Sequence, residues 1–402
     1  MDKNIEKIIN DIVWWIPFKK LRNNTRNLLL YIIKKIEKEE NIKKCDYNKQ
    51  IIYHDMNRII EFRKEIYNDN NFLDKYLSLI NNLDDESSCL VSKILSKINN
   101  FKNIDDYLYV EKEEYSRILK IENENNSRII KLNDNIFVYG KYILPMNYFE
   151  VGIFYEKYGM NYIYDLNKLE NLDIIDAGGF IGDSAIFLSY YTNKNVYSFE
   201  ALPKNYNLIL ETIRLNNRNN IVPINMALGN ENKSISIFSD GSVRCDFELT
   251  MEENATYNVK NDVYMTSLDK FVDDNNINVG LIKVDLEGFE QPFLLGALET
   301  IKKYKPILLL SIYHNYNDFF NIKTMIEQLD LNYTFKIIKS EVACAITTTL
   351  LICQSSPVQS SPVQSSPVQS SPVEVICKEH ILLYNNSKTE KLQPMMRLKN
   401  VA

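Results

Sequence analysis

The chain has 402 residues, of which 45% are hydrophobic and 11% aromatic, so it can bury a sizeable core and is not intrinsically disordered. Acidic residues outnumber basic ones, 53 to 47, and the formal net charge of -6 argues against a nucleic-acid partner because such a field repels a phosphate backbone. The six cysteines form no C-x-x-C pair and lie apart from the three histidines, which argues against a disulfide framework and a zinc site.

The first 125 residues are predicted to be an α-helical N-terminal region, packed as a small bundle. Apolar residues recur there at helical spacing in four runs, namely Ile5–Ile12, Leu21–Ile36, Leu73–Leu83 and Val91–Ile98. No apolar run approaches the roughly 18 to 20 residues that span a bilayer, and the first residues lack the basic start and apolar stretch of a signal peptide. We therefore expect a cytoplasmic protein.

Residues 14–38 form a basic stretch that begins with Trp14 and Trp15, in an otherwise acidic chain. Such a helix can lie on an anionic membrane with its indoles at the headgroup level, which would place the protein at the inner face of the membrane. The alternative, which we favour, is an ordinary bundle helix whose lysines face water while the tryptophans anchor a core.

Residues 126–353 are predicted to form an α/β domain, because strand-like and helix-like segments alternate there. Five strands separated by helices indicate a doubly wound, mostly parallel sheet. Two further runs, 333–338 and 347–352, are expected to complete a seven-stranded sheet as an antiparallel pair. The five expected strands are Leu172–Asp176, Asn195–Glu200, Ile221–Asn225, Gly280–Asp285 and Pro306–Tyr313.

Two C-terminal segments are expected to lie outside this domain. Residues 354–373 contain the repeat SSPVQ, whose prolines exclude a helix or a central strand and favour an extended, solvated linker. Residues 374–402 show no periodic pattern long enough to predict a structure and are treated as a tail.

A glycine-rich turn follows the first expected strand, in the segment IIDAGGFIGDS from Ile174 to Ser184. Glycines between a strand and a helix let backbone approach a ligand closely and direct helix N-terminal amides toward it, which suits a nucleotide-like cofactor. The dinucleotide motif G-x-G-x-x-G, counted from Gly178, requires glycine where Phe180 and Asp183 stand, so a pyrophosphate ligand is disfavoured.

Two acids at strand ends favour a cationic, ribose-bearing ligand. Asp176 ends the first strand, where it would attract an amine or a sulfonium, and Glu200 ends the second, where a carboxylate can accept both hydroxyls of a ribose. S-adenosyl-L-methionine carries all of these groups. Taken singly, Asp176 could instead cap a helix and Glu200 could be a solvated strand end.

The region Ile136–Ile338 resembles the FkbM family of methyltransferases. The matching segments, in order, are IIDAGGFIGDS, VYSFEALPKN, INMALGN, MTSLDKF and, as the most specific of them, LIKVDLEGFE at Leu281–Glu290. The sequence departs from many members at Gly179 and Phe180, where they have Ala and Asn, and in the position of the proline after Glu200. The resemblance implies a Rossmann-like fold, S-adenosyl-L-methionine as methyl donor, and O-methylation of saccharides, antibiotics or other natural products.

The cofactor is expected to contact the glycine-rich turn and the ends of the second and third strands. The predicted cofactor-binding residues are Asp176, Gly178, Gly179, Phe180, Gly182, Asp183, Ser184, Glu200, Ala201 and Asn225. Ligands of open α/β sheets bind outside the carboxyl ends of the strands, so the chemistry should lie there too.

A hydroxyl acceptor needs a base, and we predict Asp285, Glu287 and His314 as catalytic residues. Asp285 ranks first because it ends the fourth strand beside the expected sulfonium; a lone histidine such as His314 is as often a structural hydrogen bonder. Glu287 and Glu290 could join Asp285 in binding a divalent cation, but three acids within six residues are more often a cap and a solvated face, so no metal ligand is predicted. Acceptor contacts are expected in the insert 239–264.

The predicted function is thus O-methylation of a hydroxyl on a saccharide or on a glycolipid or envelope-polysaccharide precursor. Two alternatives remain open at this point. One is a non-catalytic S-adenosylmethionine-binding scaffold in surface-polymer assembly. The other, disfavoured by the glycine spacing, is an NAD-dependent oxidoreductase.

Overall fold

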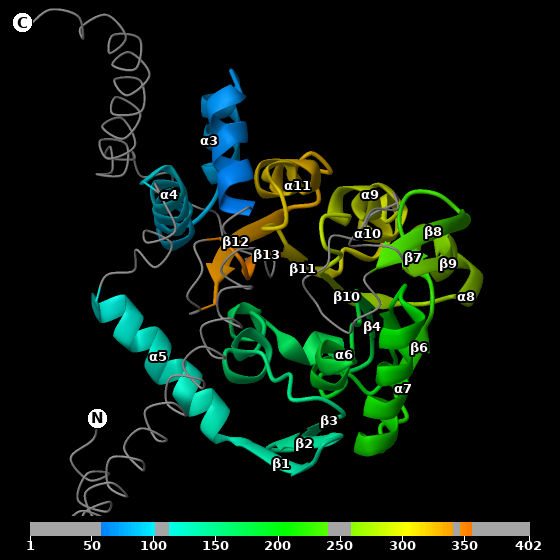
Figure 1. The fold of residues 1–402 in the computed structure, drawn as a ribbon. Coiled ribbons are helices and arrows are strands. Elements are labelled where there is room, and N and C mark those ends of the chain that lie inside the picture. Colours follow the sequence, from blue (N-terminus) through cyan, green and yellow to red (C-terminus); the bar gives the residue numbers. More distant parts are fainter. Residues whose placement is uncertain (1–57, 101–111, 240–258, 341–345, 356–402) are drawn as a thin grey trace, which may run out of the picture.

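A computed structural model describes residues 58–100, 112–239, 259–340 and 346–355. Its centre is a seven-stranded sheet with the strand order β12-β13-β11-β10-β4-β5-β6 (Figure 1). Only β13 runs antiparallel to its neighbours. The strands are β4 (Asp173–Ala177), β5 (Val196–Phe199), β6 (Ile221–Ile224), β10 (Val279–Val284), β11 (Ile307–Ser311), β12 (Tyr333–Lys339) and β13 (Thr349–Ser355). The predicted mostly parallel sheet is confirmed, as is the antiparallel pair expected from the runs 333–338 and 347–352.

The central strands are apolar on both faces because helices cover both sides of the sheet. Successive residues alternate between two hydrophobic cores, so that Ile174 belongs to one core and Ile175 to the other. The helices that follow the strands are α6 (Asp183–Leu188), α7 (Pro203–Asn216), α8 (Leu268–Asn275), α9 (Glu290–Leu295), α10 (Leu298–Tyr304) and α11 (Tyr316–Glu327). Local sequence sets some of their starts: the side chain of Asn315 accepts a hydrogen bond from the backbone N–H of Asp318 at 2.9 Å and caps α11.

The described N-terminal helices pack on the sheet domain. Residues 58–68 are helical, and α3 (Phe72–Ile80) and α4 (Asp85–Asn100) lie beside α11 and β12 (Figure 1). Phe62 makes edge-to-face ring contacts with Tyr316 and Phe319 of α11. The helices predicted from the runs 73–83 and 91–98 are present, and their apolar faces share one core with the strands instead of packing only on one another. Residues 14–38 and the two runs before residue 37 lie outside the described residues.

Helix α5 (Lys112–Ser127) leads into a small antiparallel sheet and spans the predicted domain boundary at residue 125. That sheet contains β1 (Ile129–Asn133), β2 (Ile136–Tyr139) and β3 (Tyr142–Leu144). A third sheet is formed by β7 (Ala227–Leu228), β9 (Val259–Thr266) and β8 (Lys233–Ser239). These two small sheets interrupt the regular alternation of strand and helix along the chain.

Several predictions fall partly or wholly outside the described residues. The structure describes the insert 239–264 only at its ends, in β8 and β9, so the contacts expected from it stay predictions. Gln354 and Ser355 belong to β13, two residues into the predicted linker, while residues 356–402 are not described. Among the described residues, none of the helices has both the length and the apolar composition needed to cross a bilayer.

Candidate active site

The glycine-rich turn after β4 is built around Gly178, which has a φ of +86°. A Cβ atom at this position would lie 1.9 Å from the carbonyl oxygen of Asp285, so the residue must be glycine on grounds of space as well as conformation. The turn after β4 and the turn after β10 are thereby in direct backbone contact. This contact brings the predicted cofactor loop and the predicted catalytic loop to one place at the carboxyl ends of the parallel strands.

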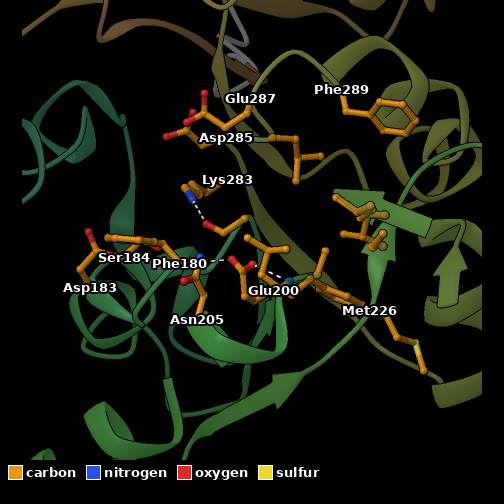
Figure 2. A pocket seen from close by; sticks show the side chains of 18 of the residues that line it. Phe180, Asp183, Ser184, Glu200, Asn205, Met226, Lys283, Asp285, Glu287 and Phe289 are labelled. Atoms are coloured by element: carbon orange, nitrogen blue, oxygen red, sulfur yellow. Dashed lines mark hydrogen bonds between the residues drawn. The ribbon is translucent and has the colours of Figure 1, made fainter. Parts of the chain in front are cut away.

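A pocket opens at this place, between the turns that follow β4, β5 and β10. Figure 2 shows Asp285 and Glu287 near one another on the side of Lys283, and Glu200 on the side of Phe180 and Asn205. The predicted residues that line it are Gly178, Phe180, Asp183, Ser184, Glu200, Ala201, Asp285 and Glu287. Lining residues that sequence reasoning did not select include Tyr148, Glu150, Asn205, Met226, Lys283 and Phe289.

Asp176 does not line the pocket. Its side chain is fully buried and accepts hydrogen bonds from the hydroxyls of Ser184 at 2.9 Å and Ser198 at 2.7 Å. The ammonium of Lys283 lies 3.2 Å from its Oδ1 atom. The structure thus gives Asp176 a role in tying β4, β5 and β10 together, because an ionised group buried without partners is costly. The expected contact between Asp176 and a cationic ligand is not seen in the pocket wall.

Three other predicted cofactor residues, Gly179, Gly182 and Asn225, also do not line the pocket. A Cβ atom on Gly179 would meet Ser198, and one on Gly182 would meet Thr212, so these glycines serve close packing within the fold. The side-chain amide of Asn225 donates to the carbonyl oxygens of Glu200 and Ala201 at 2.8 and 3.1 Å. Asn225 therefore shapes the turn that presents Glu200.

The carboxylate of Glu200 lines the pocket, and two hydrogen bonds hold it in place. One oxygen accepts a hydrogen bond from the backbone N–H of Phe180 at 2.9 Å, and the other from that of Leu202 at 2.8 Å. Burial raises the pKa of Glu200 to about 7, although these two N–H groups lower it. Each carboxylate oxygen has capacity for a second hydrogen bond, so a ligand with two adjacent hydroxyls can bind here.

Asp183 and Glu150 form the acidic end of the pocket. Burial raises the pKa of Asp183 to about 8, and the neighbouring carboxylate of Glu150 adds to the effect. The pKa of Glu150 is itself raised by burial and by Asp285, while the hydroxyl of Tyr148 donates to it at 2.9 Å. Both side chains would gain from a cationic ligand that restores their charged form. Glu150 precedes every motif in the sequence, and no spacing signal could have identified it.

On the opposite side, the three predicted catalytic residues lie together. Nε2 of His314 is 3.4 Å from Oδ1 of Asp285 and 3.3 Å from Oε2 of Glu287, while its Nδ1 atom is 2.8 Å from Oε1 of Glu290. Although burial lowers the pKa of His314, Glu290 and Glu287 raise it to about 9. Burial raises the pKa of Glu287 to about 8 despite the nearby imidazole. His314 lies behind the two acids, which are the groups that reach the pocket.

The charged side chains that line the pocket favour some nucleotide ligands over others. It includes five carboxyl groups, those of Glu150, Asp183, Glu200, Asp285 and Glu287, and one ammonium group, that of Lys283. The ammonium is occupied by Asp176 and by the carbonyl oxygen of Gly178, to which it donates at 2.5 Å. Such a lining attracts a cation and repels a pyrophosphate.

Comparison with known proteins agrees with this reading of the site. Residues 176–337 match the family model described as the methyltransferase FkbM domain. No curated protein matches the sequence. A solved structure of methyltransferase FkbM from Methylobacillus flagellatus KT is 17% identical, with 73% of this chain and 60% of that chain covered and a TM-score of 0.45. The match thus spans three fifths of that protein's length.

Two further solved structures match just under half of this chain. An rRNA methylase from Streptococcus thermophilus is 16% identical over 47% of this chain and 91% of that chain, with a TM-score of 0.31. A putative methyltransferase from Streptococcus mutans in complex with SAH is 15% identical, with the same coverage and TM-score. The matched family region begins at Asp176 and ends in β12, so it contains the glycine-rich turn, Glu200 and the loop after β10. Residues 176–337 are thus the part of the chain that is identified as a methyltransferase FkbM domain.

Proposed function

We propose that the protein transfers a methyl group from S-adenosyl-L-methionine to a hydroxyl of a saccharide or of a glycolipid or envelope-polysaccharide precursor. The observation that carries the proposal is the pocket lining, which combines a fixed carboxylate, Glu200, with further acids and no free cation among the described lining residues. S-adenosylmethionine has a ribose, an α-ammonium and a sulfonium, each suited to one of these acids.

The cofactor fits the residues present. Glu200 would accept hydrogen bonds from the ribose hydroxyls, and Asp183 would face the ammonium end. The side-chain oxygen of Asn205 is buried in the pocket and has no hydrogen-bond partner among the described residues, so it is available to a donor on the ligand. When bound, S-adenosylmethionine supplies an electrophilic methyl group.

The acceptor would bind beside Asp285 and Glu287. A hydroxyl is a weak nucleophile at neutral pH, and a positioned base contributes about 10² to 10⁴-fold to the rate. The Asp285 side chain is 29% exposed, whereas that of His314 is 2% exposed, so Asp285 is the group that can reach the acceptor. Asp285 would take the hydroxyl proton, and the hydroxyl of Tyr313, which donates to Asp285 at 3.3 Å, would hold the carboxylate in place.

The saccharide class is supported by the FkbM resemblance and by the acceptor side itself. Carboxylates of Asp285 and Glu287 are strong acceptors for the several hydroxyls of a sugar. A cytoplasmic location is the setting we propose for methylation of such a precursor.

Incubation of the full chain with methyl-labelled S-adenosylmethionine and envelope fractions of its host tests the proposal. We expect label in a saccharide or glycolipid fraction, with loss of at least about 100-fold in the Asp285→Asn variant. Exposed Glu299→Gln, on α10, is the matched control and should retain full transfer. Tight binding of S-adenosylhomocysteine without label transfer to any glycan fraction would favour the scaffold alternative instead.

A further inference from the structure

An unusual concentration of carboxyl groups surrounds one buried imidazole, behind the acceptor side of the pocket. His314 is 8% exposed and lies at the end of β11. The acids near it come from the loop after β10 and from the first turns of α9 and α11. They are Asp285, Glu287, Glu290 and Asp318, of which Glu290 and Asp318 are almost completely buried.

Both ring nitrogens of His314 are buried, and neither makes a hydrogen bond of normal geometry with a described residue. Nε2 lies 3.4 Å from Oδ1 of Asp285 and 3.3 Å from Oε2 of Glu287, and Nδ1 lies 2.8 Å from Oε1 of Glu290. One ligand atom from each of Asp285, Glu290 and His314 lies within 4.8 Å of the others. Ligands bound to a common metal at about 2.0 to 2.3 Å are typically about 3 to 4.5 Å apart, so these atoms are close to that arrangement.

The carboxyl groups near His314 outnumber the basic groups that could neutralise them. Among the described residues, Lys283 is paired with Asp176, and the guanidinium of Arg58 lies 5.6 Å from the ring centre of Tyr313. The charge of Arg58 lowers the pKa of Glu287, but no hydrogen bond joins the two side chains in the described part of the structure. A buried cluster with more carboxylates than cations gains from a bound positive ion.

The cluster is also rigid. The two oxygens of Glu290 accept hydrogen bonds from the backbone N–H groups of Leu286 at 2.7 Å and Gly288 at 3.0 Å. Asp318 is held by the side-chain amides of Gln291 at 2.7 Å and Asn315 at 2.5 Å. Glu290 therefore fixes the loop that carries Asp285, and Asp318, which does not line the pocket, is held in place behind it, as an outer-shell residue of a metal site would be.

We propose that Asp285, Glu290 and His314 bind a divalent cation. One imidazole nitrogen and two carboxylate oxygens suit Mn²⁺ or a similar transition-metal ion, whereas Ca²⁺ would require about six to eight oxygen ligands. The exposed edge of Asp285 opens the site to the pocket, so that a coordination position faces the acceptor.

The role of the cation rests on the proposed function. A hydroxyl bound to the cation loses its proton more easily, because the cation stabilises the developing negative charge on oxygen. The second carboxylate oxygen of Asp285, the base of the proposed function, then accepts that proton while the hydroxyl oxygen forms its bond to the methyl carbon and the bond from that carbon to sulfur breaks.

The site can be tested without reference to activity. The chelator-treated full chain is titrated with Mn²⁺, and binding is measured as loss of the electron paramagnetic resonance signal of the free ion. We expect one Mn²⁺ per chain with a dissociation constant below about 100 μM. Asp285→Asn should weaken binding at least about tenfold, since it removes one charged ligand. Glu150→Gln removes a charge from the same pocket without removing a ligand, and it should change the constant less than about threefold.

Absence of saturable Mn²⁺ binding, or equal binding by wild type and Asp285→Asn, would overturn the proposal. His314→Gln serves as a second ligand variant if circular dichroism shows that Asp285→Asn is not folded. Binding of S-adenosylhomocysteine is measured on the same samples. Cofactor binding without Mn²⁺ binding contradicts only the cation site, whereas Mn²⁺ binding without cofactor binding contradicts the proposed methyl donor.

Discussion

Asp183→Asn should stabilise the ligand-free protein, and by an amount that grows with pH. The carboxyl group of Asp183 is 4% exposed, faces Glu150 across the pocket, and has a pKa raised by burial from 3.8 to about 8. In the unfolded chain the same group ionises near its ordinary value. Between these two values the folded state holds a proton that the unfolded state has released, so the free energy of unfolding falls as pH rises.

The size of the effect follows from the proton balance. One proton corresponds to about 1.4 kcal/mol per pH unit, so the wild type should lose about 2 to 3 kcal/mol between pH 6 and pH 8 through Asp183 alone. Asparagine does not titrate. The difference in unfolding free energy between Asp183→Asn and wild type should therefore increase by that amount over the same interval, and level off above about pH 8.

Urea denaturation at both pH values measures this difference directly. Glu299→Gln, whose carboxylate is 75% exposed and paired with Lys302, is the control and should change the unfolding free energy by less than about 0.5 kcal/mol at either pH. The same Asp183→Asn variant should bind S-adenosylhomocysteine more weakly than wild type at pH 8, because the ammonium group loses its carboxylate partner. An equal stability difference at the two pH values would refute the assignment of Asp183 as a buried acid.

Three further variants test separate parts of the site. Gly178→Ala should cost more than about 3 kcal/mol or prevent folding, since its Cβ atom would clash with the carbonyl of Asp285; urea denaturation or yield of soluble protein measures this. Glu200→Gln should fold normally but weaken S-adenosylhomocysteine about 10 to 100-fold by calorimetry, and unchanged affinity would remove Glu200 from the cofactor site. Lys283→Met should destabilise by about 3 to 5 kcal/mol because it leaves Asp176 buried without its ammonium partner, and a shift below about 1 kcal/mol in urea would contradict that pairing.

The sequence predicted the sheet better than the roles of individual residues. Strands such as β4 and β10 are apolar runs between polar turns, and their existence follows from local pattern alone. Their register does not, because it depends on which strands become neighbours. Lys283 lies opposite Asp176 in the paired strands, and this register turns Asp176 from an expected ligand group into an internal ion-pair partner.

The other differences between prediction and structure arise from contacts between residues that are distant in sequence. Glu150 enters the pocket from a segment before the family region, where nothing in its local pattern indicates a site. The N-terminal helices show a clear helical period, but a period identifies an apolar face and not the surface that it contacts. Phe62 contacts α11 instead of forming a bundle with its neighbours alone. By contrast, Asp285 and Glu287 line the pocket at the carboxyl ends of the parallel strands, where their position after an expected strand predicts them to lie.

Calorimetric titration of the full chain with S-adenosylhomocysteine, and separately with NAD, is the most direct test of the assigned pocket. We predict saturable binding of one S-adenosylhomocysteine per chain in the micromolar range and no binding of NAD, since the acids that line the pocket attract an ammonium and repel a pyrophosphate. Saturable binding of NAD without binding of S-adenosylhomocysteine would contradict both the cofactor and the reaction proposed for this protein.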